Sequence, residues 1–324
     1  MTTMNAALCS HYGDASALTV VETEIPKRQA GELLIQVHAS SINPVDWKIL
    51  RGDLRVVFGL KPPKILGGDF AGTVLEADPN DPFNVGDKVW GLTEIRKLKS
   101  TPGAHAQITR CASHLVDHMP KNLSYNEAAT LPLVGLTAYQ SLVHHAQLKA
   151  GQRVLINGCS GGVGTIAIQL AKALGATVTG VCSDANQSLA YDLGCDQVID
   201  YTTNNLLEHA EQFDVWFDVV GHQRLGAIRH QLRPNGTYIN IVKLLSTSIS
   251  ALFNPLRKQS SHAVFVAPHA AELAILRQHI EAGAIKPIID TIYTLDDIAR
   301  AFSHSRTHRV VGKLGITMDH SVQD

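Results

Sequence analysis

Hydrophobic positions alternate with polar ones through the first ~120 residues, a period typical of β-strands with one buried face. Leu33, Ile35, Val37 and Ala39 form the hydrophobic side of one such strand. Further short strands are predicted at 70–75, 88–91 and 104–109, separated by Gly-Gly, Asp-Pro and Pro-Gly pairs. The pattern predicts a twisted, partly barrel-like β module.

The pattern changes at about residue 123, where helical spacing of apolar residues begins. A helix is predicted over 125–131, and the apolar segment 133–142 follows it. Strands and helices then alternate, with strands at 154–156, 177–182, 197–199, 215–220 and 238–242 and helices at 164–174, 187–193 and 225–232. Repeated β-α-β units of this length predict a parallel, doubly wound sheet.

The last third of the chain is less regular. Segment 244–262 has little charge and several Ser and Thr residues, so we expect a loop or a lid over a ligand. A helix is predicted over 271–282. The β-like tail that begins at Ile288 could return to the first module.

Length, composition and charge indicate a globular protein of two domains. With 324 residues, the chain is about twice the usual single-domain length, so two domains are expected. Hydrophobic residues make up 45% and charged residues 18%, which is typical of a globular chain. The net charge of −1 offers no electrostatic reason to expect nucleic-acid or membrane binding. We therefore expect a small-molecule substrate as the partner.

The cysteines and the N-terminus indicate the compartment. The five cysteines include no CxxC pair, so a disulfide framework is not expected. The first ten residues lack both the basic segment and the apolar core of a signal peptide. These features predict a soluble, cytoplasmic protein.

Residues 153–175 carry the most informative pattern, an apolar strand that runs through a glycine-rich turn into a helix. Glycines allow the backbone to approach a pyrophosphate closely, and the helix N-terminus offers free N–H groups to the anion. Gly158, Gly161 and Gly164 give the spacing GxxGxxG, with Cys159 at the place of the first glycine of the common GxGxxG pattern. A glycine-rich turn alone is a weak signal, but the flanking strands and helix favour a dinucleotide site.

The end of the second strand bears on the choice between NADH and NADPH. Asp184 favours a hydrogen bond to the ribose 2′-hydroxyl of NADH. Ser183, Asn186 and the later Tyr201 could instead hydrogen-bond a 2′-phosphate. No Lys or Arg lies at this strand end, so both coenzymes remain open.

Together with the motifs at 41–48, 66–72, 85–91, 131–138 and 193–201, the glycine turn resembles the medium-chain dehydrogenase/reductase superfamily. Within it, the chain looks like the zinc-independent quinone oxidoreductase and enone reductase branch. The resemblance implies a GroES-like β-rich catalytic domain over 1–121, completed by 284–324, a Rossmann domain over 122–283, and an active site in the cleft. It also implies NADPH, with NADH as the alternative because the family's phosphate-binding Lys or Arg is missing. Homodimers or tetramers are common in the family.

The resemblance implies roles for three residues of the N-terminal module. Lys48 is expected to donate a hydrogen bond to the substrate oxygen, Asn43 to contact the nicotinamide ribose and Asp46 to orient Lys48. The alternatives are a solvated surface lysine and loop capping by the two Asx side chains. The expected coenzyme contacts are Asn43, Thr137, Gly158, Ser160, Gly161, Gly162, Val163, Gly164, Ser183, Asn186, Tyr201, Val220 and Gly221.

No zinc is expected. The zinc alcohol dehydrogenases have a Cys in the stretch that matches 44–46 and a Gly-His-Glu that matches 67–69, and both ligands are absent here. One cluster has suitable ligand types, namely His105, Cys111, His114 and His118. Strand alternation turns neighbouring positions to opposite faces, and 16 histidines make chance clusters common, so we regard it as a weak alternative.

The expected chemistry is therefore metal-free. A conjugated enone or quinone delocalises the charge left by hydride addition, so hydrogen-bond donors can replace a Lewis acid. We expect an NAD(P)H-dependent reductase of quinones or α,β-unsaturated carbonyls. One alternative is an enoyl-thioester reductase, which would need a basic entrance for a phosphorylated carrier that the neutral composition does not single out. The other is a catalytically silent NADPH-binding regulatory protein.

Overall fold

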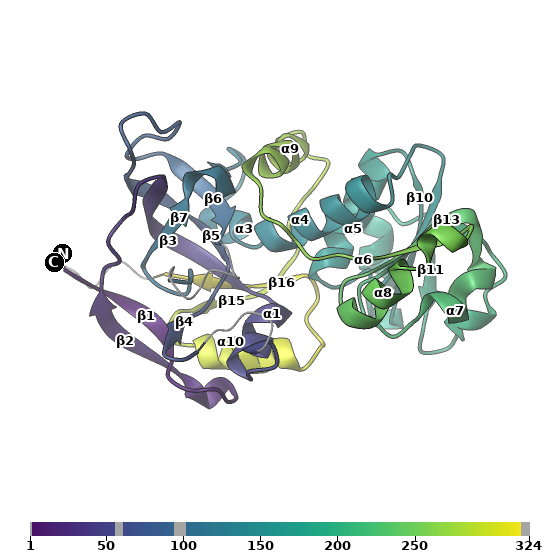
Figure 1. The fold of residues 1–324 in the computed structure, drawn as a ribbon, viewed down its shortest axis with the longest axis horizontal. Coiled ribbons are helices and arrows are strands. Elements are labelled where there is room, and N and C mark those ends of the chain that lie inside the picture. The colour runs from purple at the N-terminus through teal and green to yellow at the C-terminus, as the bar shows by residue number, and fades with distance from the viewer. Residues whose placement is uncertain (1, 56–60, 94–101, 319–324) are drawn as a thin grey trace. The chain divides into compact units, whose positions relative to one another are not determined.

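The computed structural model describes residues 2–55, 61–93 and 102–318, which form two compact units (Figure 1). Unit 1 comprises Met1–Leu133, Pro268–Glu281 and Ile289–Asp324, and unit 2 comprises Val134–Ala267 and Ala282–Ile288. The boundaries of these units differ from the expected domain boundaries, which lie between residues 121 and 122 and between residues 283 and 284. The expected boundaries stay a prediction.

Side-chain contacts explain why two segments expected in the Rossmann domain cluster with unit 1. Helix α3 (Tyr125–Ala128) is tied to the unit 1 sheet by a hydrogen bond of 3.0 Å between the hydroxyls of Tyr125 and Thr73. Helix α9 (Ala270–Glu281) contributes Arg277, whose Nε donates to Asp117 at 2.8 Å.

Unit 1 is built on a seven-stranded sheet. The strand order is β15-β16-β3-β5-β6-β8, and β7 also pairs with β3. The bounds are β3 Glu32–Ile42, β5 Asp69–Glu76, β6 Lys88–Leu92, β7 Ile108–Ala112, β8 Val116–His118, β15 Ile289–Thr294 and β16 Lys313–Thr317. The tail strand β16 runs antiparallel to β3, with Leu314 opposite Ile42, so the tail returns to the first module as expected.

A second sheet and short helices complete unit 1. The sheet has the order β2-β1-β4, with β1 at Thr3–Cys9, β2 at Leu18–Glu24 and β4 at Lys64–Ile65. The helices include α1 (Pro44–Leu50) and α10 (Ile298–Arg306). Strand β3 is buried on both sides, because Leu33, Ile35 and Val37 join the main core while Leu34 packs in a smaller cluster with Met4. The expected polar side of β3 is therefore partly covered.

Unit 2 contains a six-stranded sheet in the order β11-β10-β9-β12-β13-β14, with every pairing parallel (Figure 1). This is the strand order of a doubly wound dinucleotide-binding fold, and it confirms the predicted class. The strands are β9 Arg153–Asn157, β10 Thr177–Cys182, β11 Gln197–Asp200, β12 Phe213–Asp218, β13 Leu232–Asn240 and β14 Ser260–Ala263. The helices include α5 Gly162–Ala173, α6 Gln187–Asp192, α7 Leu225–Ile228 and α8 Leu244–Ala251, and α4 (Pro132–Tyr139) spans the unit boundary.

The expectation of a loop over 244–262 is wrong, and a lid over a ligand stays a prediction. This segment forms α8 and then β14, which pairs in parallel with β13 and supplies the sixth strand. Thr247 and Ser261 are buried, whereas Leu245, Leu252 and Leu256 are among the exposed apolar side chains, so burial does not account for the low charge. Asn254 fixes the connection, because its Nδ2 donates to the carbonyl of Ser261 at 2.9 Å.

Within the described ranges, none of the helices has both the length and the apolar character that crossing a bilayer requires.

Candidate functional site

The glycine turn of unit 2 connects the end of β9 to the start of α5. Gly158 has a φ of +89°, a left-handed conformation that a side chain would strain. The amides of Gly158 and Cys159 both donate to the carbonyl of Val181, at 3.0 and 3.1 Å. The turn is therefore held against strand β10.

Gly164 and Gly161 of the turn are required to be glycines for different physical reasons. A Cβ on Gly164 would lie 2.2 Å from the carbonyl oxygen of Gly158, so this position must stay a glycine for the helix to pack on the turn. A Cβ on Gly161 would lie 3.7 Å from the same oxygen, the single atom of the surrounding protein within 4 Å of it. The first N–H groups of α5 have no acceptor within the helix. Gly161 thus leaves open space where a pyrophosphate would meet those donors, and the turn fits a dinucleotide.

Cys159, the departure from the common glycine pattern, is accommodated by a glycine in the neighbouring strand. A Cβ on Gly180 of β10 would lie only 2.8 Å from the sulfur of Cys159 and 2.7 Å from that of Cys195. Hydrogen bonds with Cys182 and Cys195 raise the pKa of Cys159, which keeps it a thiol. The side chain packs under the turn and is fully buried.

The end of β10 brings together four of the residues expected to contact the coenzyme. Nδ2 of Asn186 lies 3.3 Å from Oγ of Ser160 in the glycine turn and 3.3 Å from Oγ of Ser183. Tyr201 joins the same strand end through its amide, which donates to Cys182 at 3.1 Å, and its side chain is 54% exposed. The carboxylate of Asp184 accepts a hydrogen bond from Gln187 at 2.9 Å.

The remaining predicted contacts of unit 2 lie on other elements. Thr137 is on α4 and is buried. Val220 and Gly221 follow β12; Val220 is partly exposed, and the amide of Gly221 donates to Asp218 at 2.8 Å. A doubly wound fold binds ligands at the carboxyl ends of its strands, where these two residues lie.

In unit 1, Asn43 lies in a cluster of buried polar side chains, which we call the buried polar cluster: Ser41, Asn43, Asp46, Asp69 and Lys313. Asp69 Oδ2 accepts hydrogen bonds from Ser41 Oγ at 2.6 Å and Asn43 Nδ2 at 2.7 Å, and Lys313 Nζ is 3.7 Å away. Lys313 Nζ also donates to Asn43 Oδ1 at 2.5 Å. The amide group of Asn43 is therefore held at both ends by buried charges.

Asp46 closes the cluster at the start of α1. It forms a capping box with Asn43, whose backbone amide donates to Asp46 Oδ2 at 2.8 Å. Burial and, less strongly, the negative charge of Asp69 raise the pKa of Asp46 to about 7. Burial lowers the pKa of Lys313.

Replacing Asp46 with Asn should flatten the pH dependence of stability. Between its ordinary pKa of 3.8 and about 7, Asp46 holds a proton in the folded chain that it releases on unfolding. The free energy of unfolding should therefore fall as pH rises through this window, and Asp46→Asn should reduce that slope. Urea unfolding at a series of pH values measures it. Asp53→Asn, on an exposed side chain, is the control, and an unchanged slope in Asp46→Asn would contradict the assignment.

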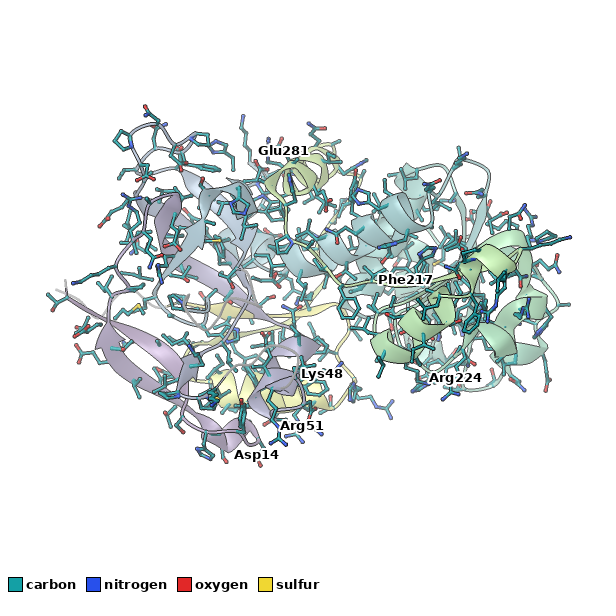
Figure 2. The ribbon with its side chains drawn as sticks, in the orientation of Figure 1. Asp14, Lys48, Arg51, Phe217, Arg224 and Glu281 are labelled. Atoms are coloured by element: carbon teal, nitrogen blue, oxygen red, sulfur yellow. The ribbon has the colours of Figure 1, made fainter. Side chains whose placement is uncertain are left out.

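Lys48 also lies on α1, and Arg51 is the C-cap of that helix (Figure 2). Lys48 is half-buried, and its Nζ lies 5.6 Å from the centroid of the Trp47 ring. Burial lowers the pKa of Lys48, and the charge of Asp53 partly offsets this effect. The contacts described for Asp46 are with Asn43 and the backbone of Gly67, so they give no support to the expected orientation of Lys48 by Asp46.

The alternative metal cluster is not assembled. His105 is buried against Phe302, its Nε2 lies 3.3 Å from the carbonyl of Ser41, and burial lowers its pKa to about 4. Cys111 is buried in β7, and the ring of His118 packs against that of Phe83. In the part of the chain that the structure describes, no group of three or more His, Cys, Asp or Glu side chains could hold a metal ion. The absence of a metal from the working protein stays a prediction.

Sequence reasoning assigned no role to Asp69 and Lys313. Both stand in recognisable places, Asp69 after Gly67-Gly68 at the start of β5 and Lys313 at the start of the tail strand β16. A charged residue at the first position of a buried strand is the signal that could have identified them, because such a charge needs a partner.

The comparisons with known proteins agree with this geometry. The family model described as alcohol dehydrogenase GroES-like domain matches residues 29–121, and the one described as zinc-binding dehydrogenase matches 193–314. A chloroplastic quinone-oxidoreductase homolog from Spinacia oleracea is 31% identical, covering 96% of this chain and 97% of that protein. The 2-methylene-furan-3-one reductase of Solanum lycopersicum is 32% identical, covering 94% and 77%.

Solved structures point the same way. The structure of the quinone oxidoreductase from Coxiella burnetii has a TM-score of 0.89 at 28% identity, covering 98% of this chain and all of that one. The β-rich unit 1, the parallel sheet of unit 2 and these near full-length relatives lead to one assignment. This chain belongs to the medium-chain dehydrogenase/reductase superfamily, within its quinone and enone reductase branch.

Proposed function

We propose that this chain transfers a hydride from NADPH to a quinone or an α,β-unsaturated carbonyl compound without a metal ion. The observation that carries the proposal is the open space at Gly161 in front of the first N–H groups of α5. Relatives named as a quinone-oxidoreductase homolog and a 2-methylene-furan-3-one reductase support the choice of acceptor.

The residues of unit 2 would bind and orient the coenzyme, which when bound supplies the hydride. The N–H groups of Gly162, Val163 and Gly164 would hydrogen-bond its pyrophosphate. Ser183 and Asn186 at the end of β10 would hold the adenine ribose and its 2′-phosphate.

We favour NADPH over NADH for a local reason. Ser183 and Asn186 place a hydroxyl and an amide together at the strand end, and both groups can donate hydrogen bonds to a 2′-phosphate. Parallel titration with both coenzymes tests this choice. A tighter dissociation constant for NADH would contradict it.

On the acceptor side, Lys48 would donate a hydrogen bond to the carbonyl oxygen, where negative charge develops as the hydride arrives. The lowered pKa of its half-buried amine makes transfer of a proton to that oxygen easier. Asn43 is held by Asp69 and Lys313, so the buried polar cluster would fix the start of the helix that carries Lys48.

Replacing Lys48 with Ala should lower kcat/KM for a small quinone by about 10²-fold or more, because a charge-stabilising donor is lost. The dissociation constant of NADPH should change little. Steady-state kinetics and a fluorescence titration measure the two quantities. Lys88→Ala is the matched control, because the Lys88 ammonium also lies over an aromatic ring, 5.5 Å from the centroid of Tyr125. Unchanged turnover in Lys48→Ala would remove the lysine from the mechanism.

An acceptor panel tests the proposed class against its two alternatives. Turnover with quinones or enones supports the proposal, and turnover confined to enoyl thioesters favours the thioester reductase. Tight NADPH binding without turnover on any of the three would favour the regulatory protein.

A cytoplasmic location and a homodimer are further parts of this proposal. Relatives whose names place them in mitochondria and chloroplasts make the location worth testing directly. Fractionation of cells and size-exclusion chromatography would test these two points.

A further inference from the structure

The distribution of charge within unit 2 is very uneven. Residues 219–267 contain no Asp or Glu. The cations of this segment are Arg224, Arg229, Arg233, Lys243, Arg257 and Lys258. The chain as a whole has a net charge of −1, so the local excess of positive charge is invisible in the overall composition.

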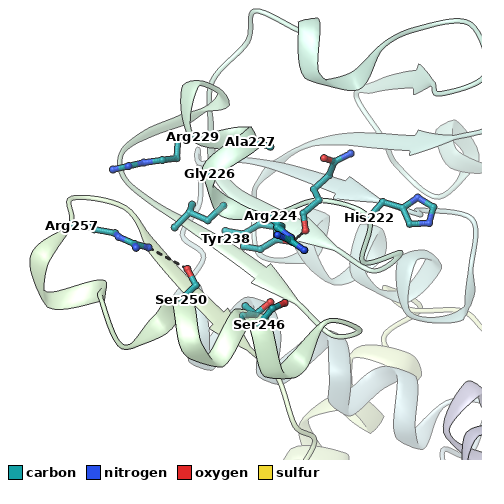
Figure 3. Close-up of a pocket in the computed structure, with 12 residues that line it drawn as sticks. His222, Arg224, Gly226, Ala227, Arg229, Tyr238, Ser246, Ser250 and Arg257 are labelled. Atoms are coloured by element: carbon teal, nitrogen blue, oxygen red, sulfur yellow. Dashed lines mark hydrogen bonds between the residues drawn. The ribbon is translucent and has the colours of Figure 1, made fainter. Parts of the chain in front are cut away.

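Part of this segment surrounds a pocket of about 580 Å³ between α7 and α8 (Figure 3). His222, Arg224 and Arg229 line it from the region of α7, and Ser246, Ser250 and Arg257 line it from the region of α8. Most of the lining residues belong to the segments that follow β12 and β13 along the chain. A pocket of this volume can hold a ligand the size of a nucleotide.

The three arginines of the pocket form no ion pair within the described ranges. Arg257 donates from Nη1 to Ser250 Oγ at 3.2 Å, as Figure 3 shows, and Arg229 donates from Nε to Gln259 at 3.3 Å. Both partners are neutral. Arg224 is exposed. By contrast, seven arginines elsewhere are paired with carboxylates: Arg28, Arg51, Arg110, Arg153, Arg233, Arg277 and Arg300.

We propose that this pocket is a binding site for a phosphate-bearing ligand of nucleotide size. Arg224 and Arg257 would hold the phosphate, since guanidinium groups without carboxylate partners can form charge-assisted, bidentate hydrogen bonds to it. The hydroxyls of Ser246 and Ser250 would add neutral hydrogen bonds. Two soluble sources share this chemistry, a free nucleotide and the nucleotide end of a coenzyme A thioester. The inference stands whether or not the proposed reductase function holds.

The experiment measures binding of adenosine 3′,5′-bisphosphate and of coenzyme A to the full chain by calorimetry, with and without saturating NADPH. We expect binding that persists when NADPH is present, because none of the residues that line the pocket is an expected coenzyme contact. Arg224→Gln and Arg257→Gln should each weaken binding about tenfold or more. Thermal unfolding checks that each variant is folded.

Lys258→Gln is the matched control. It removes the same charge from the residue next to Arg257, and its exposed side chain does not line the pocket. Equal losses of affinity in Lys258→Gln and Arg257→Gln would overturn the proposal. The probes would then respond to the positive charge of the segment as a whole and not to a direct contact with Arg257. Absence of binding, or displacement of both probes by NADPH, would overturn it as well.

Comparison of the probes separates the two sources. Tighter binding of coenzyme A than of the bisphosphate assigns the pocket to a thioester, and equal binding assigns it to the nucleotide alone. Failure of the proposed reductase function would be recognised by a different result, namely that NADPH does not bind at the glycine turn.

Discussion

Replacing Gly161 with Ala is expected to leave unit 2 folded and to weaken NADPH binding by at least about tenfold. The backbone φ of Gly161 is −81°, which alanine adopts without strain, and the added methyl group meets no protein atom closer than 3.7 Å. The methyl would instead occupy the space that the pyrophosphate needs in front of α5. A fluorescence titration with NADPH and a thermal unfolding curve measure the two effects.

Gly164→Ala is the companion variant, and it should weaken NADPH binding and also lower the stability of the fold. Its methyl group would lie 2.2 Å from the carbonyl oxygen of Gly158, so the turn or the helix must move. Overpacking of this kind typically costs about 1–3 kcal/mol of stability. If Gly161→Ala bound NADPH normally, or lost as much stability as Gly164→Ala, the placement of the coenzyme would be wrong.

Replacing Lys313 with Met is expected to lower the free energy of unfolding by about 3–5 kcal/mol. The ammonium is buried, donates to Asn43 at 2.5 Å and lies 3.7 Å from the buried carboxylate of Asp69. Methionine has a similar length but no charge, so Asp69 would remain buried without its compensating cation. Urea unfolding of the full chain measures the loss.

The double variant Lys313→Met/Asp69→Asn separates lost charge compensation from lost packing. Removing both charges should recover part of the stability, because the penalty of a lone buried carboxylate disappears. Lys172→Met is the control, since Lys172 pairs with Asp196 at a partly exposed site and should cost about 1 kcal/mol or less. Additive losses in the double variant would show that the two charges do not interact.

The parallel sheet was predictable because its signals are local. Strands β9 and β10 are short and largely apolar, and the glycine turn lies between them with a helix at the right distance. The segment 244–262 was misjudged because α8 and β14 are rich in Ser, a residue that favours turns and helix caps over regular structure. The segment contains a strand because β14 pairs with β13, and this pairing joins residues that are more than twenty positions apart in the sequence.

The buried polar cluster was less predictable for the same reason. Asn43, Asp69 and Lys313 are far apart in the sequence, and the meeting of β16 with β3 brings Lys313 to the start of α1. Capping by Asn43 and Asp46 is a local signal and was anticipated as an alternative. The contact expected between Asp46 and Lys48 relied on closeness in sequence, yet the Asp46 carboxylate bonds the backbone of Asn43.

Cys159 and Gly180 cannot vary independently. The sulfur of Cys159 occupies volume that a side chain on Gly180 would need, so the glycine missing from the turn has its counterpart in the adjacent strand. A comparison of sequences that scores the turn alone would count Cys159 as a defect in the fingerprint. Restoring glycine at 159 alone would leave a void in a tightly packed interior, and a side chain on Gly180 would still meet the sulfur of Cys195.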